Sequence, residues 1–189
     1  MPGSPVRLYE LRMTARTAIA SLAVVIVSDL ARLVVLYRPA DRRYAWLDLG
    51  SRWVFGIALL STIITFLWWL YVALRNLVRW GLRPRWGPGW AVGSWLIPVA
   101  DLVLPLLVVR EAARRSGSGP GGLALVLVWW VVFLAGEGLG DFSTLPAAVT
   151  VPVFIAAAAL AIAVVAHITG LQVRHHGAAR ATVPVLSRV

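Results

Sequence analysis

The sequence contains no cysteine, and this absence removes several kinds of chemistry at once. Without a thiol the chain forms no disulfide, holds no metal through Cys ligands and has no thiolate nucleophile. Charge is also scarce, at 14% of residues, whereas hydrophobic residues make up 60% and the mean hydropathy is +0.81. Soluble domains are only about 45–50% apolar. The composition is therefore that of an integral membrane protein.

Lysine is absent too, so all 18 basic residues are arginine, and the formal net charge is +10. These Arg residues lie at the ends of apolar segments, where positive charge sets topology and contacts anionic headgroups. We therefore expect no nucleic-acid partner. A Gly-rich phosphate loop, an HExxH motif and a Ser-His-Asp order are also missing. The sequence favours a non-enzymatic protein without deciding the question, and it calls for no cofactor and no metal.

Five apolar segments can be distinguished, at residues 17–37, 53–73, 89–109, 122–136 and 146–171. They predict an all-α integral membrane bundle, with four transmembrane helices and a further, third segment that Pro98 and Pro105 break. Residues 1–171 form this single domain. Residues 172–189 are expected to be a basic, irregular C-terminal tail. The Gly- and Ser-rich residues 116–121 are expected to be a flexible linker.

The distribution of arginine distinguishes two topologies for the third segment. If all five segments span, the better orientation places 10 connecting Arg residues inside and 7 outside. If the third segment enters and returns on one side, 13 lie inside and 4 outside. An apolar segment of 21 residues is long enough to cross, but the Arg bias favours the re-entrant form, with both termini cytoplasmic. In that form the break at Pro98–Asp101 lies at depth, enclosed by the second, fourth and fifth segments.

Residues 66–115 carry the most specific pattern in the chain. A Trp-Leu-Tyr helix end with Arg and Asn precedes Pro-Gly-Trp-Ala-Val-Gly-x-Trp-x-x-Pro, a second Pro and an Arg-Glu pair. The residues of this pattern are Trp69, Leu70, Tyr71, Arg75, Asn76, Pro88, Gly89, Trp90, Trp95, Pro98, Pro105, Arg110 and Glu111. The stretch resembles domain of unknown function 4328, a membrane family found mainly in actinobacteria. The resemblance implies a bacterial membrane protein but no particular activity, and Asp101 stands where the family usually has Asn.

This stretch also holds the first candidate site for a ligand. Its members are polar or helix-breaking residues of the second and third segments, namely Arg75, Asn76, Trp95, Pro98, Asp101, Pro105 and Glu111. Asp101 is either a proton or cation site, a partner of Arg75, or a cap on a broken helix. On a continuous helix it would share one face with Pro98 and Pro105. Glu111, among three Arg residues, is expected on a solvated face.

A second candidate site involves Asp29, Arg32 and His167. Asp29 and Arg32 are three residues apart, so mutual neutralisation on one helix face is the simpler interpretation. His167 is either a hydrogen-bonded packing residue or a ligand. It lies beside a stripe of small residues that would let another helix approach closely. The stripe consists of Ala156, Ala159, Ala163, Ala166 and Gly170.

Two functions remain open. The first is a binding, scaffolding or accessory protein of the cell membrane that uses the cytoplasmic region 75–115. Its partners would be the lipid bilayer with its anionic headgroups, a membrane or cytoplasmic protein, or further copies of the chain. The alternative is a small-solute or proton transporter that uses Asp101 and Asp29.

Overall fold

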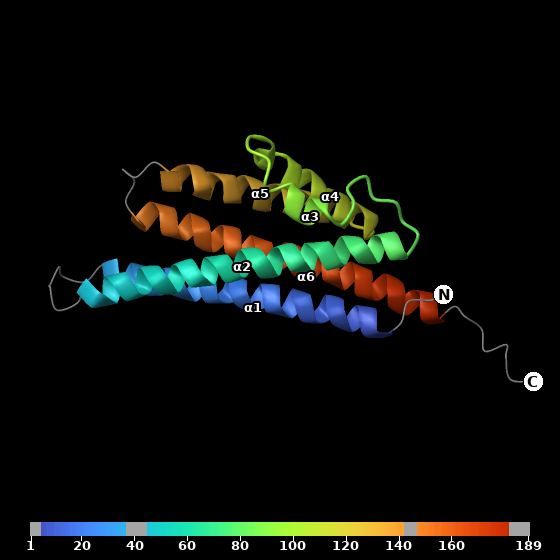
Figure 1. Ribbon diagram of the computed structural model, residues 1–189, viewed down its shortest axis with the longest axis horizontal. Coiled ribbons are helices and arrows are strands. Elements are labelled where there is room, and N and C mark those ends of the chain that lie inside the picture. Colours follow the sequence, from blue (N-terminus) through green and yellow to red (C-terminus); the bar gives the residue numbers. More distant parts are fainter. Residues whose placement is uncertain (1–4, 37–44, 142–146, 182–189) are drawn as a thin grey trace, which may run out of the picture.

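The computed structural model describes residues 5–36, 45–141 and 147–181, and the regular elements in these ranges are helices. They are α1 (Pro5–Leu36), α2 (Ala45–Arg79), α3 (Trp90–Gly93), η2 (Ala100–Leu102), α4 (Leu104–Arg115), α5 (Pro120–Asp141) and α6 (Ala147–Ala181). Figure 1 shows the four long helices, α1, α2, α5 and α6, lying along one axis, with α3 and α4 on one side of them. The prediction of an all-α bundle is confirmed.

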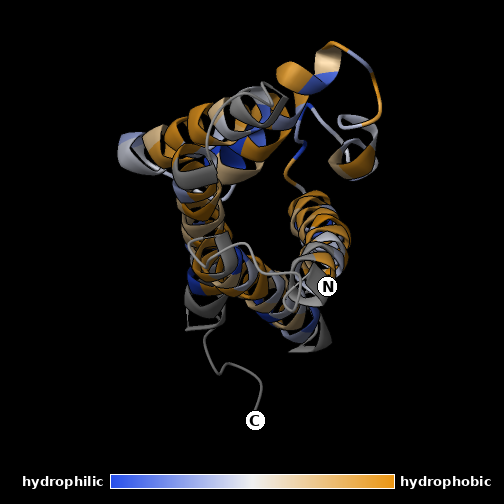
Figure 2. Cartoon of the chain, turned by 90° about the vertical axis from the view of Figure 1, so that its left-hand side faces the viewer, coloured by the Kyte–Doolittle hydropathy of each residue, from blue (hydrophilic) through white to orange (hydrophobic). Residues whose placement is uncertain are grey.

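The four long helices are also the ones that can cross a membrane. Among the described residues, the candidate spans are Leu8–Val34, Leu49–Arg79, Pro120–Gly138 and Val149–His175. Apolar residues cover these helices on most sides, as the orange colour in Figure 2 shows. A helix that is apolar all round is buried in protein or lipid, and large side chains such as Ile57 and Trp68 are more than half exposed here. These outward apolar faces are suited to contact with lipid chains.

The third apolar segment turns back on itself instead of crossing the bundle. The backbone N–H of Arg85 donates to Oε1 of Glu111 (3.2 Å), so the beginning and the end of this segment lie together. Between them α4 has 12 residues, about 18 Å, which is too short for a ~30 Å hydrocarbon core. We call residues 86–115 the hairpin. It packs on α2 and α5, and the arrangement with five spanning segments does not fit this structure.

Five of the helices therefore have one of their ends at the same end of the bundle. The first turns of α1 and α5 and the last turns of α2, α4 and α6 lie there (Figure 1). The side chains confirm this neighbourhood, because Arg75 contacts Glu10 and Gln172 contacts Ser116. We call it the basic end, since it holds Arg79, Arg83, Arg85, Arg110, Arg114 and Arg115.

Aromatic rings hold the hairpin against α2 and α5. The rings form one cluster of Phe66, Trp69, Trp95, Trp129, Trp130 and Phe133. The Trp95 ring of the hairpin lies with its centroid 6.3 Å from that of Phe66 and 5.7 Å from that of Trp130, both edge-on. Such edge-to-face pairs are favourable beyond the area they bury. The cluster therefore fixes where the hairpin sits.

One expectation about the hairpin is wrong, and a second does not apply. The break is not enclosed by other helices, since Leu96 is 73% exposed and Val99 is 81% exposed. A shared face of Pro98, Asp101 and Pro105 was expected only on a continuous helix, and no continuous helix joins these residues. Val99 directly follows Pro98 and takes a φ of 68°, a strained conformation for a β-branched residue. The segment thus reverses direction at an exposed, apolar tip.

Three further expectations differ from the structure. Residues 116–121 form a tight turn rather than a flexible linker, because Ser116 is buried and α5 already begins at Pro120. α6 continues past Leu171 to Ala181, where an irregular tail was expected, and residues 182–189 lie outside the described residues. On α6 the stripe of small residues from Ala156 to Gly170 is mostly exposed and does not form the helix contact that was expected. Its neighbours Ala157, Ala158, Ala161, Val164, Val165 and Ile168 form the buried face.

Candidate functional site at the basic end

Two helices finish at the basic end with the same glycine motif. After α2, Gly81 takes a φ of 78°, and the N–H groups of Gly81 and Leu82 donate to the carbonyl oxygens of Val78 and Leu77 (3.0 and 3.1 Å). After α4, Gly117 takes a φ of 88° in the corresponding bond pattern. Glycine suits this position because positive φ costs it little. The helix ends are therefore sharp, and the basic residues near them have fixed backbone positions.

Glu111 is the centre of the site. Its side chain is only 7% exposed, and both carboxylate oxygens accept hydrogen bonds. Oε2 accepts from Nη2 and Nε of Arg114 (2.5 and 3.1 Å), and Oε1 accepts from Nε of Arg115 (2.9 Å) and from the backbone N–H of Arg85. The expectation of a solvated Glu111 is wrong. This carboxylate ties the loop after α2 to the last turn of α4.

The surroundings of Glu111 also set its protonation. Burial acts most strongly and raises the pKa of the carboxyl, but the hydrogen bonds from Arg115, Arg114 and the Arg85 N–H together outweigh it. The pKa of Glu111 is therefore lowered from its ordinary value. Glu111 stays ionised at neutral pH, and it compensates two of the cations at this end.

Arg75 and Asn76 are neighbours in the sequence with different environments. Arg75 pairs with Glu10 of α1 (Nη2–Oε2 2.5 Å) and lies over the Tyr71 ring. It does not pair with Asp101, which was one of the alternatives. Asn76 is 1% exposed, and neither its Oδ1 nor its Nδ2 has a hydrogen-bond partner in the described part of the chain. Arg75 thus joins α1 to α2, whereas Asn76 is an unsatisfied buried amide.

A second amide, Gln172 of α6, joins three helices. Its Nε2 donates to the carbonyl oxygen of Ala73 in α2 (3.3 Å) and to Oγ of Ser116 at the end of α4 (2.9 Å). Ser116 Oγ donates in turn to the carbonyl oxygen of Ala112 (2.7 Å). Since Gln172 is fully buried, these bonds form in a low-dielectric interior. Gln172 therefore attaches the base of the hairpin to the frame of long helices.

His167, five residues before Gln172 in α6, attaches the turn between α4 and α5 to the same helix. Its Nε2 lies 2.9 Å from Oγ of Ser118, so the two side chains share a hydrogen bond. Gly122 leaves room for this bond, because a Cβ there would collide with both Ser118 and His167. His167 contacts neither Asp29 nor Arg32. It packs at the basic end, and the second candidate site is not assembled.

Asp29 and Arg32 pair with each other, as their spacing predicts. Nη1 of Arg32 lies 3.4 Å from Oδ1 of Asp29, and its guanidinium also lies over the Phe55 ring at 4.6 Å from the centroid. Asp29 is 1% exposed. The pair therefore places these two opposite charges of α1 within one helix turn.

The remaining candidates lie on the hairpin, away from the basic end. Asp101 is half-buried in η2, and α4 has no side-chain cap, so the capping role considered for Asp101 is wrong. Its carboxylate has no hydrogen bond or ion pair within the ranges 5–36, 45–141 and 147–181. Pro105 lies in the first turn of α4, where its missing N–H is harmless. Close by, Trp130 Nε1 donates to the carbonyl oxygen of Leu102 (2.9 Å) and satisfies a backbone group that the break leaves open.

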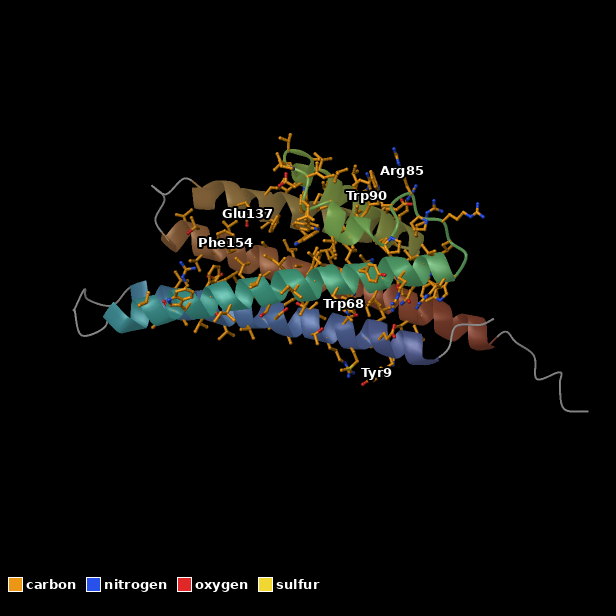
Figure 3. All side chains as sticks on the ribbon, viewed as in Figure 1. Tyr9, Trp68, Arg85, Trp90, Glu137 and Phe154 are labelled. Carbon is orange, nitrogen blue, oxygen red and sulfur yellow. The ribbon has the colours of Figure 1, made fainter. Side chains whose placement is uncertain are left out.

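No group of three His, Asp or Glu side chains in the described residues is placed to hold a metal ion. What the site offers is therefore a set of guanidinium groups. Arg79, Arg83 and Arg110 are exposed and have no carboxylate partner among the residues described. Arg85 points away from the bundle (Figure 3), with its guanidinium 5.6 Å from the centroid of the Trp86 ring. Exposed guanidinium groups at helix ends are suited to bind phosphate or carboxylate.

Comparison with protein families gives one match. The domain of unknown function DUF4328 matches residues 35–173. The chain belongs to this family. The match includes α2, the hairpin and α5 in full, together with most of α6, whereas most of α1 lies before it. No curated protein and no solved structure matches the chain. The DUF4328 region therefore contains the hairpin and the two helices, α2 and α5, on which it packs.

Sequence reasoning missed several residues that build the site. Glu10, Ser116, Ser118 and Gln172 were not candidates, although each joins separate helices or turns. Glu10 had a signal, because it is the one acidic residue among the Arg residues before the first span. Gln172 had a weaker signal as the single amide near the end of the last apolar segment. Their partners could not be read from the sequence, since each partner is distant along the chain.

Proposed function

We propose that this DUF4328 protein is a multi-pass protein of the bacterial cell membrane that binds anionic phospholipid headgroups at its basic end. The observation that carries the proposal is the imbalance of charge in residues 75–115. Seven Arg residues lie there with two acidic residues, Asp101 and Glu111. Asp101 is at the far tip of the hairpin and Arg75 pairs with Glu10, so Glu111 is the one carboxylate of this region beside the other six Arg residues. The excess of exposed guanidinium groups supports binding of phosphate-bearing headgroups.

The orientation follows from the same charges. Juxtamembrane Arg residues accumulate on the cytoplasmic side, where anionic lipid attracts them. The basic end is therefore cytoplasmic, and both termini are on that side. In this orientation the protein acts as a binding or accessory protein, and region 75–115 is the surface that it presents to lipid.

The proposal is tested by removing the exposed charges of the loop. The triple change Arg79→Gln, Arg83→Gln and Arg85→Gln leaves the Arg75–Glu10 pair and the Glu111 hydrogen bonds in place. Each Arg near an anionic surface contributes about 1 kcal/mol, so we expect retention of phosphatidylglycerol in native mass spectrometry to fall about tenfold or more. The matched control is the triple change Arg12→Gln, Arg16→Gln and Arg174→Gln. If the loop variant retains phosphatidylglycerol like the unchanged protein, the proposal fails.

The transport hypothesis has less support. Asp29 lies on α1 and is paired with Arg32, whereas Asp101 lies on the hairpin, which packs on α2 and α5. The two carboxylates therefore do not line one route through the bundle. A flux assay in liposomes still tests the hypothesis, since proton or solute flux that disappears with Asp101→Asn would restore it.

A further inference from the structure

The outward face of α4 changes from apolar to basic along its length. Val103, Leu107, Arg110 and Arg114 follow one another at helical spacing on this face. Val103 is 53% exposed and Arg114 is 60% exposed, whereas Val108, Val109, Ala112 and Ala113 on the opposite face are buried. The four long helices have no such division, because they are apolar on most sides. α4 therefore has the side-chain distribution of a helix that crosses a membrane–water interface.

The length of α4 agrees with one leaflet. Val103 and Arg110 are seven residues apart, about 10 Å along the helix axis, and Val103 and Arg114 are about 16 Å apart. The hydrocarbon part of one leaflet is about 15 Å thick, half of the whole core. With the two Arg residues at the headgroups, Val103 lies deep among the acyl chains. The exposed residues Val99 and Leu102, which precede Val103 by four residues and by one, then lie near the same depth.

The guanidinium of Arg114 is both fixed and available. Glu111 accepts two of its five N–H donors, from Nε and Nη2, which holds the group in one orientation. The remaining N–H groups are free to donate to a phosphate. Arg110 lies one helical turn deeper and is exposed, without a carboxylate partner in the described part of the chain. The two cations together fit the single negative charge of a phosphodiester with its glycerol headgroup.

We propose that the outward face of α4 is a binding site for one anionic phospholipid. The phosphate lies at Arg110 and Arg114, and an acyl chain lies along Leu107 and Val103. The hairpin thereby occupies a single leaflet, with its tip in contact with acyl chains. This inference rests on the proposed function and deepens it, since it names the site and the ligand class.

The lipid site is tested by native mass spectrometry with phosphatidylglycerol as the probe. We expect Arg110→Gln with Arg114→Gln to lower the retention of the tightest-bound phosphatidylglycerol about tenfold. The matched control is Arg12→Gln with Arg16→Gln, which removes two exposed Arg residues from α1 and should change this lipid little. Equal losses in the two variants would overturn the α4 site while leaving the proposed function standing. The α4 site is likewise overturned if neither double variant lowers phosphatidylglycerol retention while the triple variant of Arg79, Arg83 and Arg85 does.

The depth of the hairpin is tested separately, in liposomes of phosphatidylcholine without anionic lipid. In this cysteine-free chain, single nitroxide labels at positions 103 and 110 report depth through their accessibility to oxygen and to an aqueous nickel complex. We expect label 103 to lie at acyl depth, like a reference label at position 60 of α2, and label 110 to lie near the headgroups. A label at position 103 that is accessible to the aqueous nickel complex would overturn the inference, whatever the result of the phosphatidylglycerol test. Arg110→Gln alone, which leaves the Glu111 bonds intact, repeats the lipid test should the double variant misfold.

Discussion

The four long helices and the hairpin differ in how their backbone N–H and C=O groups find hydrogen-bond partners. In the long helices most backbone groups are satisfied within their own helix, and polar side chains join helix to helix. Trp69 Nε1 donates to Thr169 Oγ1 (3.0 Å), and Ser21 shares a hydrogen bond with Thr65 (2.7 Å). At the hairpin, side chains bond to backbone groups that the helix breaks leave open. Trp130 binds the carbonyl oxygen of Leu102, and Glu111 binds the N–H of Arg85.

The difference follows from the helix breaks. Each interruption frees backbone N–H and C=O groups, and these are costly in an apolar environment unless protein or water satisfies them. The hairpin is therefore the part of the molecule that depends most on single side chains. The frame of long helices depends on many weak contacts, any one of which can be lost at small cost. The following predictions, from the largest expected effect to the smallest, test this comparison.

The largest effect is expected from Glu111→Gln. The change leaves Arg114 and Arg115 without their carboxylate and weakens the bond from the Arg85 N–H, which should lower the free energy of unfolding by about 2–4 kcal/mol. Thermal unfolding in detergent measures this loss. A loss below that of the Arg75–Glu10 pair described last would contradict the comparison between hairpin and frame.

The same residue gives a pH dependence. The pKa of Glu111 is lower in the folded protein than in the unfolded chain, so its contribution to stability is complete above the unfolded value. The contribution is lost as the pH falls through the folded value, which is below the ordinary pKa of Glu. Unfolding temperatures measured from neutral to acidic pH should show this loss in the unchanged protein. Glu111→Gln should be flatter over the same range, and an identical decline in both proteins would exclude Glu111 as its source.

Gly122→Ala tests the joint between hairpin and frame. The new methyl group displaces Ser118 or His167 and breaks their hydrogen bond, with an expected loss of about 1–2 kcal/mol. Its neighbour Gly121 is the matched control, because a Cβ there meets no atom within 4 Å. Gly121→Ala should stabilise α5 by a few tenths of a kcal/mol. The two changes should therefore shift the unfolding temperature in opposite directions.

Trp130→Phe tests the bond that supports the hairpin tip. The change keeps a ring in the aromatic cluster but removes the donor to the Leu102 carbonyl oxygen, which should cost about 1 kcal/mol. Hydrogen exchange of the peptide that contains residues 99–104 should speed up more than exchange in α6. Trp129→Phe is the control, since it alters the same cluster and leaves this bond in place. Equal exchange in both variants would show that the bond does not support the tip.

The smallest effect is expected in the frame, from the Arg75–Glu10 pair. Both side chains are partly exposed, at 26% and 43%, so solvent screens the attraction. A double-mutant cycle with Arg75→Gln and Glu10→Gln should give a coupling of about 0.5–1 kcal/mol. A coupling as large as the loss from Glu111→Gln would remove the distinction between frame and hairpin.

Much of the fold could be predicted because a helix that crosses a lipid bilayer must be long enough and apolar enough. Length and continuous apolar character are enough to recognise the four long helices, since such a segment must satisfy its own backbone. The Asp29–Arg32 pair was predictable for a similar reason, because its partners are three residues apart on one helix. Only the helix ends were misplaced. α1 begins at Pro5 and α6 ends at Ala181, and helical ends that extend beyond the bilayer have no apolar signal.

What the sequence by itself determined is thus the class of protein, the four spans and the charge that marks the basic end. The tertiary structure alone decided how the third segment is used. Its 21 mostly apolar residues were long enough to span, and the choice of a hairpin depends on contacts between distant residues. Trp95 packs with Phe66 and Trp130, Glu111 meets Arg85, and Gln172 meets Ser116. The burial of Glu111 and the half-buried position of Asp101 follow from these contacts, because the environment of a charged side chain is set by its neighbours in space and not by those in sequence.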